Sequence, residues 1–541
     1  MSRAISLNIF GGAMKLPKRT RTILRIVFVW LSLIVGLGFA CNVLAATPTP
    51  LAGLQFETQI TIPTWTTSGP TQASTDTWSF DPSTNTLYFA DRVNKGVSVI
   101  DTNTNTYLGT IAVPGCDGTG SCPSGVLVAP DLHKLVVTDR LIGAGATLKD
   151  LNHIFIYDLR ILSAPPVTLT VDPAVCTACS GTAFDTDELE YDPLNQRAYV
   201  ANTSAPFFLT VVDLNTNTIV DQIPLPSNPE QPRFNPVDGM IYQSIPDDAD
   251  PNTGQNSAVL RIDPTKTGAA AIVATFRLGP SCLTRGIDID PLTNQAIVGC
   301  AADGPQVLMD LSGNMSLLDT FPGVTGTDTE YFNPNLRRWY TASSNNTNSG
   351  VQCPGNAANP QVFPVVGVFA APRKLGEKAT LVGAECSGTN GHDIGVDPVH
   401  NQVYVGVRQL ADPNSLSSGS PGVLVWHDPA PLAQPRLVEE SVARLNSLAG
   451  GQSNGRVLIF DSHVVRATIT NVTSDKPALL NVTTTIGNEV VDCDSSGTSI
   501  ICGGVLKGRA LIQGVVILAS GGTPVAKGTI VPQLGKVDLN D

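Results

Sequence analysis

A repeated turn between two short strand-like segments constrains the fold of this chain most strongly. The turn occurs seven times in the 541 residues, and Pro follows its first residue each time: Asp81, Ala129, Asp192, Asn235, Asp290, Asn333 and Asp397. The segments after the turns read LYFAD, LVVTD, AYVAN, IYQSI, AIVGC, WYTAS and VYVGV. Asp, Asn and Pro favour tight turns, and alternating Val, Ile, Tyr and Phe favour strands. A period of about 40 to 60 residues with this content is typical of propeller blades. The sequence therefore predicts an all-β fold built around a seven-bladed β-propeller.

The two ends of the repeat region indicate how the ring closes. The first repeat contains four strand-like segments, WSF, LYFAD, VSVI and YLGTIAV, whereas the seventh ends after its third, GVLVWHD at 422–428. Residues 54–62, LQFETQITI, resemble a fourth strand that stands before the first blade. An N-terminal strand that completes the last blade protects sheet edges that would otherwise be exposed. We expect a propeller over residues 54–430, closed in this way.

The repeat stops before the end of the chain. Over 434–451, apolar residues recur at the spacing of one helix face and Gly450 can end a helix, so this stretch predicts a linker helix. Strand-like segments such as ALLNVTTTI and ALIQGVVILA follow it. They predict a small β-sandwich-like domain over 452–541.

The N-terminus has the composition of a secretory signal. Basic residues precede an apolar run from Ile26 to Ala40, so residues 1–45 read as a signal peptide and the mature chain as periplasmic or extracellular. Lipidation at Cys41 is not favoured, because Gly38 stands where a lipobox has Leu. Without residues 1–45 the formal charge of the chain is −19, which disfavours nucleic acid as a partner. The apolar run is too short to predict a membrane span.

Ten cysteines remain after the signal, and they fall in close sequence pairs. An even, paired count in an exported chain favours disulfides over metal ligation. The predicted bridges join Cys116 to Cys122, Cys176 to Cys179, Cys282 to Cys300, Cys353 to Cys386, and Cys493 to Cys502. The first four would lie on loops at one face of the ring and shape a binding surface.

The repeated segments and the DTNTNT and DLNTNT corners resemble the YVTN-type β-propeller repeat family, which includes exported bacterial propellers. The resemblance covers about residues 54–430. It implies a propeller fold but no single activity, because related propellers serve as scaffolds, lactonases, lyases and dehydrogenase subunits. In propellers of this kind, ligands bind where the channel opens beside the start of the inner strands.

Counting five residues back from each turn gives the equivalent channel-mouth position in every blade. All seven residues there are polar: Asp76, Ser124, Asp187, Glu230, Arg285, Asp328 and His392. Positions three and one before the turn are mostly apolar, with Glu330 as the exception. The polar ring can hold a Ca²⁺ or Mg²⁺ cofactor, perform acid–base chemistry, or only fasten neighbouring blades.

A second acidic segment offers a weaker metal hypothesis. Asp247, Asp248, Asp250 and Asn252 alternate as in a calcium loop. Val259 stands at the twelfth position, where an EF-hand needs Glu, so an ordinary solvated loop is the preferred interpretation.

These features favour an exported binding or scaffold propeller that presents its disulfide-stapled face to a protein or small-molecule partner. Two alternatives stay open. One is a metal-assisted hydrolase or lyase, lactonase-like, acting at the channel mouth. The other is a cofactor-free subunit of a periplasmic oxidoreductase. The sequence favours a non-enzymatic role over an enzymatic one and leaves the oligomeric state undecided.

Overall fold

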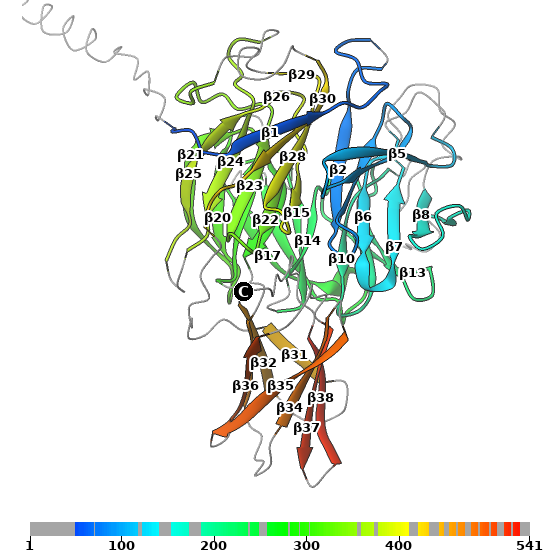
Figure 1. Ribbon diagram of the computed structural model, residues 1–541, viewed down its shortest axis with the longest axis vertical. Coiled ribbons are helices and arrows are strands. Elements are labelled where there is room, and N and C mark those ends of the chain that lie inside the picture. The colour runs from blue at the N-terminus through cyan, green and yellow to red at the C-terminus, as the bar shows by residue number, and fades with distance from the viewer. Residues whose placement is uncertain are drawn as a thin grey trace, which may run out of the picture. The chain divides into compact units, whose positions relative to one another are not determined.

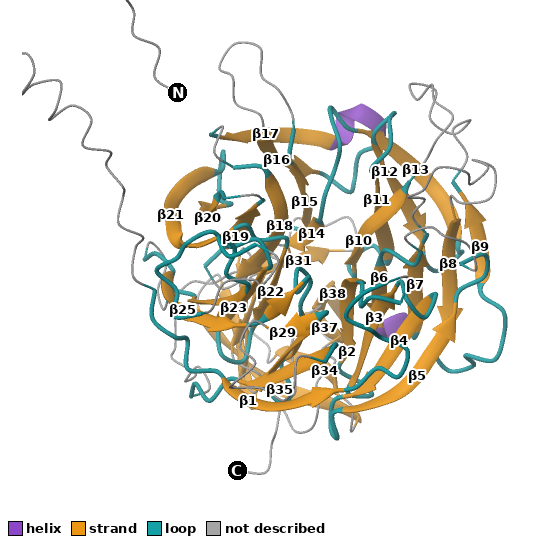
Figure 2. Ribbon diagram, turned by 90° about the horizontal axis from the view of Figure 1, so that it is seen from above, coloured by secondary structure: helices purple, strands orange, loops and turns teal. Residues whose placement is uncertain are grey.

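Seven four-stranded antiparallel sheets follow one another around a ring in the computed structural model (Figure 2). The structure describes residues 49–431 apart from gaps at 70, 117–121, 140–152, 172–184, 236–237, 248–256, 280–281, 291–292, 302, 354–358, 373–376 and 411–419. It also describes the backbone of eight strands between 443 and 530. The predicted all-β fold and the seven blades are confirmed.

Each of the first six blades uses four consecutive strands, with the first of them next to the channel (Figures 1 and 2). Blade 1 consists of β2 (Thr75–Asp81), β3 (Thr86–Asp91), β4 (Gly96–Asp101) and β5 (Thr106–Ala112). Blade 2 consists of β6 (Val126–Ala129), β7 (Lys134–Thr138), β8 (His153–Asp158) and β9 (Val167–Thr170). Blade 3 consists of β10 (Thr186–Asp192), β11 (Arg197–Asn202), β12 (Phe208–Asp213) and β13 (Thr218–Pro224). Blade 4 consists of β14 (Pro232–Asn235), β15 (Met240–Ile245), β16 (Ser257–Ile262) and β17 (Ile272–Leu278). Blade 5 consists of β18 (Thr284–Asp290), β19 (Gln295–Cys300), β20 (Pro305–Asp310) and β21 (Ser316–Thr325). Blade 6 consists of β22 (Thr329–Asn333), β23 (Arg338–Ser343), β24 (Val365–Ala370) and β25 (Thr380–Cys386).

The last blade contains a strand from the start of the chain. β27 (Gly395–Asp397), β28 (Gln402–Val407) and β30 (Gly422–His427) are joined by β1 (Gln55–Ile60), which pairs antiparallel with β30. This confirms the predicted closure of the ring. A separate two-stranded ribbon, β26 (Gly388–Thr389) with β29 (Gln409–Leu410), lies in the same region of the chain.

The repeated turns have a common backbone geometry. In every blade the residue just before the second strand has a positive φ: Asn85, His133, Gln196, Gly239, Asn294, Arg337 and Asn401. At the turn that begins with Asp192, Oδ1 accepts the backbone N–H groups of Leu194 and Asn195. Asx turns of this kind explain why Asp and Asn recur at the first position.

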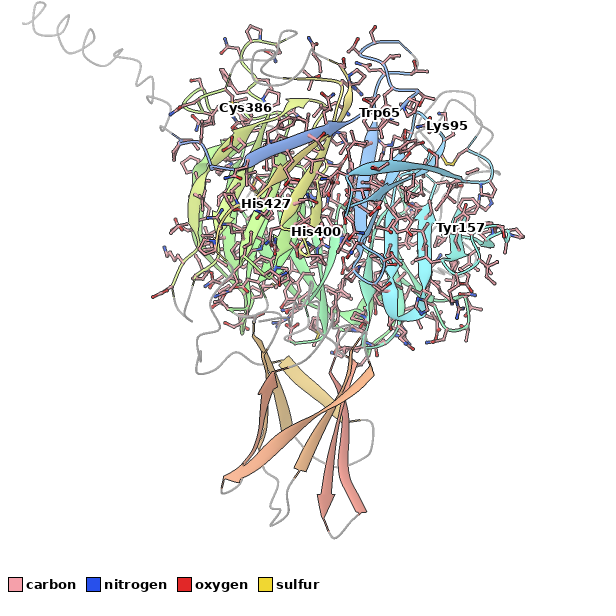
Figure 3. The ribbon with its side chains drawn as sticks, in the orientation of Figure 1. Trp65, Lys95, Tyr157, Cys386, His400 and His427 are labelled. Atoms are coloured by element: carbon pink, nitrogen blue, oxygen red, sulfur yellow. A yellow bond between two sulfur atoms is a disulfide. The ribbon has the colours of Figure 1, made fainter. Side chains whose placement is uncertain are left out.

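The hydrophobic core is divided among the junctions between blades. Seven clusters of buried residues each combine side chains from two neighbouring blades. Trp78 and Leu87 of blade 1, for example, pack with Tyr404 and Val425 of blade 7. Trp65, on the segment that links β1 to blade 1, joins this cluster and donates Nε1–H to the carboxylate of Asp91 at 3.1 Å (Figure 3). The apolar positions three and one before the turns thus hold adjacent blades together, as predicted.

The C-terminal strands form one antiparallel sheet that closes on itself, in place of the two sheets of a sandwich. They are β31 (Ala443–Ser447), β32 (Asn454–Phe460), β33 (Val464–Thr470), β34 (Ala478–Thr484), β35 (Gly487–Ser496), β36 (Ser499–Val505), β37 (Gln513–Ser520) and β38 (Thr523–Ile530).

The linker helix predicted over 434–451 is wrong where the structure describes that stretch. Residues 443–447 form β31, which pairs with both β32 and β38. Hydrogen bonding to two neighbouring strands outweighs the local helical spacing of apolar residues.

In the described part of the chain, no helix is long and apolar enough to cross a membrane.

Candidate functional site at the channel mouth

The seven predicted ring residues lie at the start of the inner strands, at one edge of the blades. Asp76, Asp187 and Arg285 are the second residues of β2, β10 and β18. The other four stand one to three residues before an inner strand: Ser124, Glu230, Asp328 and His392. The ring is joined through three local groups of contacts.

The first group joins blades 1, 2 and 3. The Ser124 hydroxyl lies 2.8 Å from Oδ2 of Asp76 and 2.5 Å from Oδ1 of Asp187. Because a hydroxyl carries one proton, it can donate to only one of these carboxylates at a time. Arg92, which follows β3, forms an ion pair with Asp76 and donates to Ser124 Oγ at 3.1 Å. Counting back from the turns did not find Arg92.

The second group joins blades 4, 5 and 6. Arg285 pairs with Glu230, and its Nε lies 3.9 Å from Oδ1 of Asp328. The side chains of Arg285 and Asp328 are each 37% exposed. Burial raises the pKa of Asp328, against the opposing charges of His392 and Arg285. Arg285 and Asp328 are therefore the ring residues of this group that an incoming ligand can reach.

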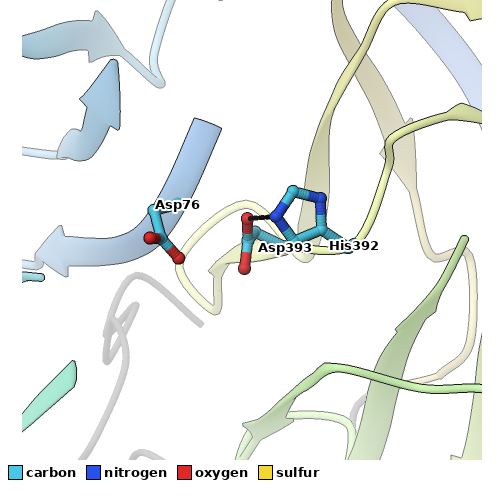
Figure 4. A group of neighbouring side chains, drawn as sticks. All are labelled: Asp76, His392 and Asp393. Atoms are coloured by element: carbon cyan, nitrogen blue, oxygen red, sulfur yellow. Dashed lines mark ion pairs between the residues drawn. The ribbon is translucent and has the colours of Figure 1, made fainter. Parts of the chain in front are cut away.

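The third group lies where blade 7 meets blade 1. His392 Nε2 is 2.9 Å from Oδ2 of Asp393, and Nδ1 lies 2.9 Å from the carbonyl oxygen of Asn390 (Figure 4). Burial opposes the charged imidazole, but the charge and hydrogen bond of Asp393, aided by Asp328, raise the pKa of His392 to about 9. One ligand atom each from Asp76, His392 and Asp393 lies within 4.8 Å of the others.

Two buried carboxyl groups close to the ring, those of Glu330 and Glu188, have few hydrogen-bond donors. Glu330 is fully buried, and neither of its carboxylate oxygens has a hydrogen-bond partner among the described residues. Burial raises its pKa well above the ordinary value, and the charges of Asp328 and Asp288 add to the shift. Glu188 accepts a hydrogen bond from Gln231 at 3.3 Å, and burial followed by the charge of Glu230 raises its pKa.

A charged cluster lies deeper, at the positions two residues before the turns. Arg233 donates to Glu190 at 2.9 Å, and its Nε lies 3.4 Å from Oδ1 of Asp288. The guanidinium also stands 5.1 Å from the centre of the Tyr331 ring, within cation–π range. Burial raises the pKa of Glu190 to about 7, although Arg233 opposes the shift. The turn-based count would have found this cluster if it had been applied to polar residues at that offset.

Three predicted disulfides are confirmed: Cys116–Cys122, Cys282–Cys300 and Cys353–Cys386 (Cys386 is labelled in Figure 3). They lie at the same edge of the blades as the ring. Cys300, for instance, pairs in register with Thr284, the residue before Arg285, and Cys122 is two residues from Ser124.

The remaining cysteine and calcium-loop predictions are only partly within the described structure. Cys176 and Cys179 lie outside the described residues. The strand register places Cys493 opposite Cys502, as a bridge between β35 and β36 requires. Asp247 follows β15 and is exposed, whereas Asp248, Asp250 and Asn252 lie outside the described residues.

Comparison with known proteins gives no family assignment. No protein-family profile matches the chain, and no curated protein matches it. Among solved structures, the fold is similar to a chain of Kuenenia stuttgartiensis hydrazine synthase, with a TM-score of 0.45 and 14% identity over 66% of this chain and 96% of that chain. A likeness at this level carries no argument about activity. The propeller architecture rests on the strand pairing, and the YVTN-type repeat family stays a prediction.

Proposed function

We propose that this chain is an exported binding protein whose channel mouth receives a positively charged group of its ligand. The observation that carries this proposal is the unequal charge of the mouth. The ring and its neighbours hold more carboxylates than cations: Asp76, Asp187, Glu230, Asp328 and Asp393 against Arg92, Arg285 and His392. Clefts lined by one sign of charge concentrate ligands of the opposite sign. A protonated amine or a guanidinium has this charge and also supplies hydrogen-bond donors.

The surroundings of the mouth support a binding role. Cys116–Cys122 and Cys282–Cys300 restrain the segments that lead into Ser124 and Arg285. Loops held on a rigid scaffold are where propellers and other folds place their binding residues. A restrained mouth loses less conformational entropy when a ligand is bound.

Calorimetric titration with spermine tests the proposal. The chain is first treated with EDTA and kept at low ionic strength, so that metal ions do not contribute. We expect saturable binding that Asp328→Asn weakens by roughly tenfold, about 1.4 kcal/mol. Asp319→Asn is the matched control, because Asp319 is 40% exposed and pairs with Lys378 at 3.2 Å, but lies on the outer strand β21.

Two results would reject the proposal. One is the absence of spermine binding at low ionic strength. The other is an equal loss of affinity in the Asp328 and Asp319 variants, which would indicate nonspecific attraction to an acidic surface.

A second candidate function is a metal-assisted hydrolase or lyase at the same mouth. The proximity of ligand atoms from Asp76, His392 and Asp393 favours it. Calorimetric titration with Ca²⁺ and Mg²⁺, repeated on an Asp76→Ala, Asp328→Ala double variant, tests it. Absence of binding, or binding that the double variant leaves unchanged, would reject a metal-dependent reaction with these ions at the mouth. Among the described residues, nothing bears on a role as an oxidoreductase subunit.

A further inference from the structure

The contact between blade 1 and blade 7 is where the ring of blades closes. Asp76 is on β2 of blade 1, and His392 and Asp393 precede β27 of blade 7. Figure 4 shows the two carboxylates and the imidazole facing one another across this junction. One ligand atom from each side chain lies within 4.8 Å of the other two. Residues more than 300 positions apart in sequence thus supply one nitrogen and two oxygen ligands.

The orientation of His392 is that of a metal ligand. Nδ1 donates to the Asn390 carbonyl at 2.9 Å, which turns Nε2 toward the carboxylate of Asp393. Histidines that bind metals commonly donate their other ring N–H to a backbone carbonyl or a carboxylate, because this bond fixes the ring and its tautomer. Asn390 is outside the group of three, so this hydrogen bond is an observation separate from the clustering of ligand atoms.

Asp76 and Asp393 each supply carboxylate oxygens, which are common ligands of metal ions. The Asp393 side chain is 2% exposed, and its Oδ2 has the His392 ring as its ion-pair partner. Asp76 engages Arg92 and Ser124 through Oδ2.

We propose that Asp76, His392 and Asp393 bind a divalent first-row metal ion such as Zn²⁺ or Mn²⁺, and that the ion fastens blade 7 to blade 1. One imidazole with two carboxylates suits such ions, because imidazole favours Zn²⁺ and its neighbours in the series while carboxylates also accept Mn²⁺. When the ion binds, it takes the place of the proton on Nε2, and that proton leaves to solvent.

The test uses the EDTA-treated mature chain and follows Zn²⁺ binding by calorimetry. We expect one ion per chain and a higher thermal unfolding midpoint in its presence, since an ion that binds only the folded state stabilises it. Co²⁺ is the spectroscopic probe, and nitrogen and oxygen ligation should give visible absorption that Zn²⁺ abolishes. His392→Gln and Asp393→Asn should each lower the affinity at least 100-fold and remove the Co²⁺ absorption.

His400→Gln is the matched control. His400 Nδ1 pairs with Asp397 Oδ2 at 2.6 Å, in the turn after β27, so it is a second His–Asp pair in the same blade. This variant should bind Zn²⁺ and Co²⁺ like the unaltered chain. Circular dichroism in EDTA shows whether the His392 and Asp393 variants fold. If one of them does not, Asp76→Asn is used in its place.

Three outcomes would overturn the inference. They are the absence of Zn²⁺ and Mn²⁺ binding, binding that the site variants leave unchanged, and an equal loss in the His400 variant. Spermine binding is measured in EDTA, so the metal site and the proposed function can fail separately.

Discussion

The carboxylate of Glu330 lies directly against Gly286 of the neighbouring blade, with Oε2 1.8 Å from where a Cβ on residue 286 would stand. Gly299 makes a similar contact, with Oε1 2.0 Å from the corresponding point. A buried carboxyl group without a hydrogen-bond donor carries a high desolvation cost when it is ionised. The packing thus leaves space for the side chain of Glu330, but no described residue donates a hydrogen bond to its carboxylate oxygens.

Glu330→Gln should stabilise the chain at alkaline pH. The folded-state pKa of Glu330 is raised above its unfolded value, so the folded chain binds the additional proton. The contribution of Glu330 is therefore most favourable below the unfolded pKa and is lost as the pH rises, by at most about 1.4 kcal/mol per pH unit from this group. Urea unfolding at pH 5 and pH 8 should show an advantage of the variant at pH 8 that shrinks toward pH 5. An advantage that is the same at both pH values would contradict the assignment.

Gly286→Ala should destabilise the chain by steric overlap. The new methyl group would meet Oε2 of Glu330 and, at 2.8 Å, the carbonyl oxygen of Asp328. Overpacking of this kind costs about 1 to 3 kcal/mol. Chemical denaturation of Gly286→Ala, Glu330→Ala and the double variant gives the coupling energy. We expect the double variant to be more stable than the sum of the single effects predicts, and exact additivity would refute the contact.

Arg233→Met should be one of the most destabilising single substitutions in the channel. It removes the cation between Glu190 and Asp288, whose side chains are 6% and 9% exposed. Leaving buried charges unpaired costs about 3 to 5 kcal/mol. Arg160→Met is the control, because Arg160 is 64% exposed and pairs with the partly exposed Asp158. Exposed pairs are screened by solvent and contribute little to stability. Equal losses in urea unfolding would show that the Arg233 cluster is not the buried network described above.

Removal of β1 should open the last blade. A chain that starts at residue 63 lacks the strand that pairs with β30 and so exposes the edge of Gly422–His427. Unpaired strand edges promote association. Compared with a chain that starts at residue 49, we expect a lower thermal unfolding midpoint and larger species in size-exclusion chromatography. A monomer of unchanged unfolding temperature would show that β1 does not contribute to closure.

Much of the channel mouth was predictable because the blades share one strand register. Residues at the same offset from equivalent turns lie at the same edge of their sheets, so the count selected the seven ring residues, from Asp76 to His392. Arg92 was missed because it follows the second strand and reaches this edge through the antiparallel pairing of Thr75 with Asp91. Asp393 was missed because it is one residue past the counted position. The network of Arg233 with Glu190 and Asp288 was missed because only apolar positions were considered below the ring.

The sequence by itself determined the elements that depend on local chemistry. Asx turns, alternating apolar residues and nearby cysteines specified the strands, the seven blades and three confirmed disulfides, because each of these is set mainly by residues close in the chain. The tertiary structure decided which polar groups meet. Asp76 faces Asp393, and Arg233 joins Glu190 to Asp288, only because neighbouring blades bring their inner strands together around one channel. Residues 443–447 likewise form a strand because pairing with two distant strands outweighs a local helical pattern.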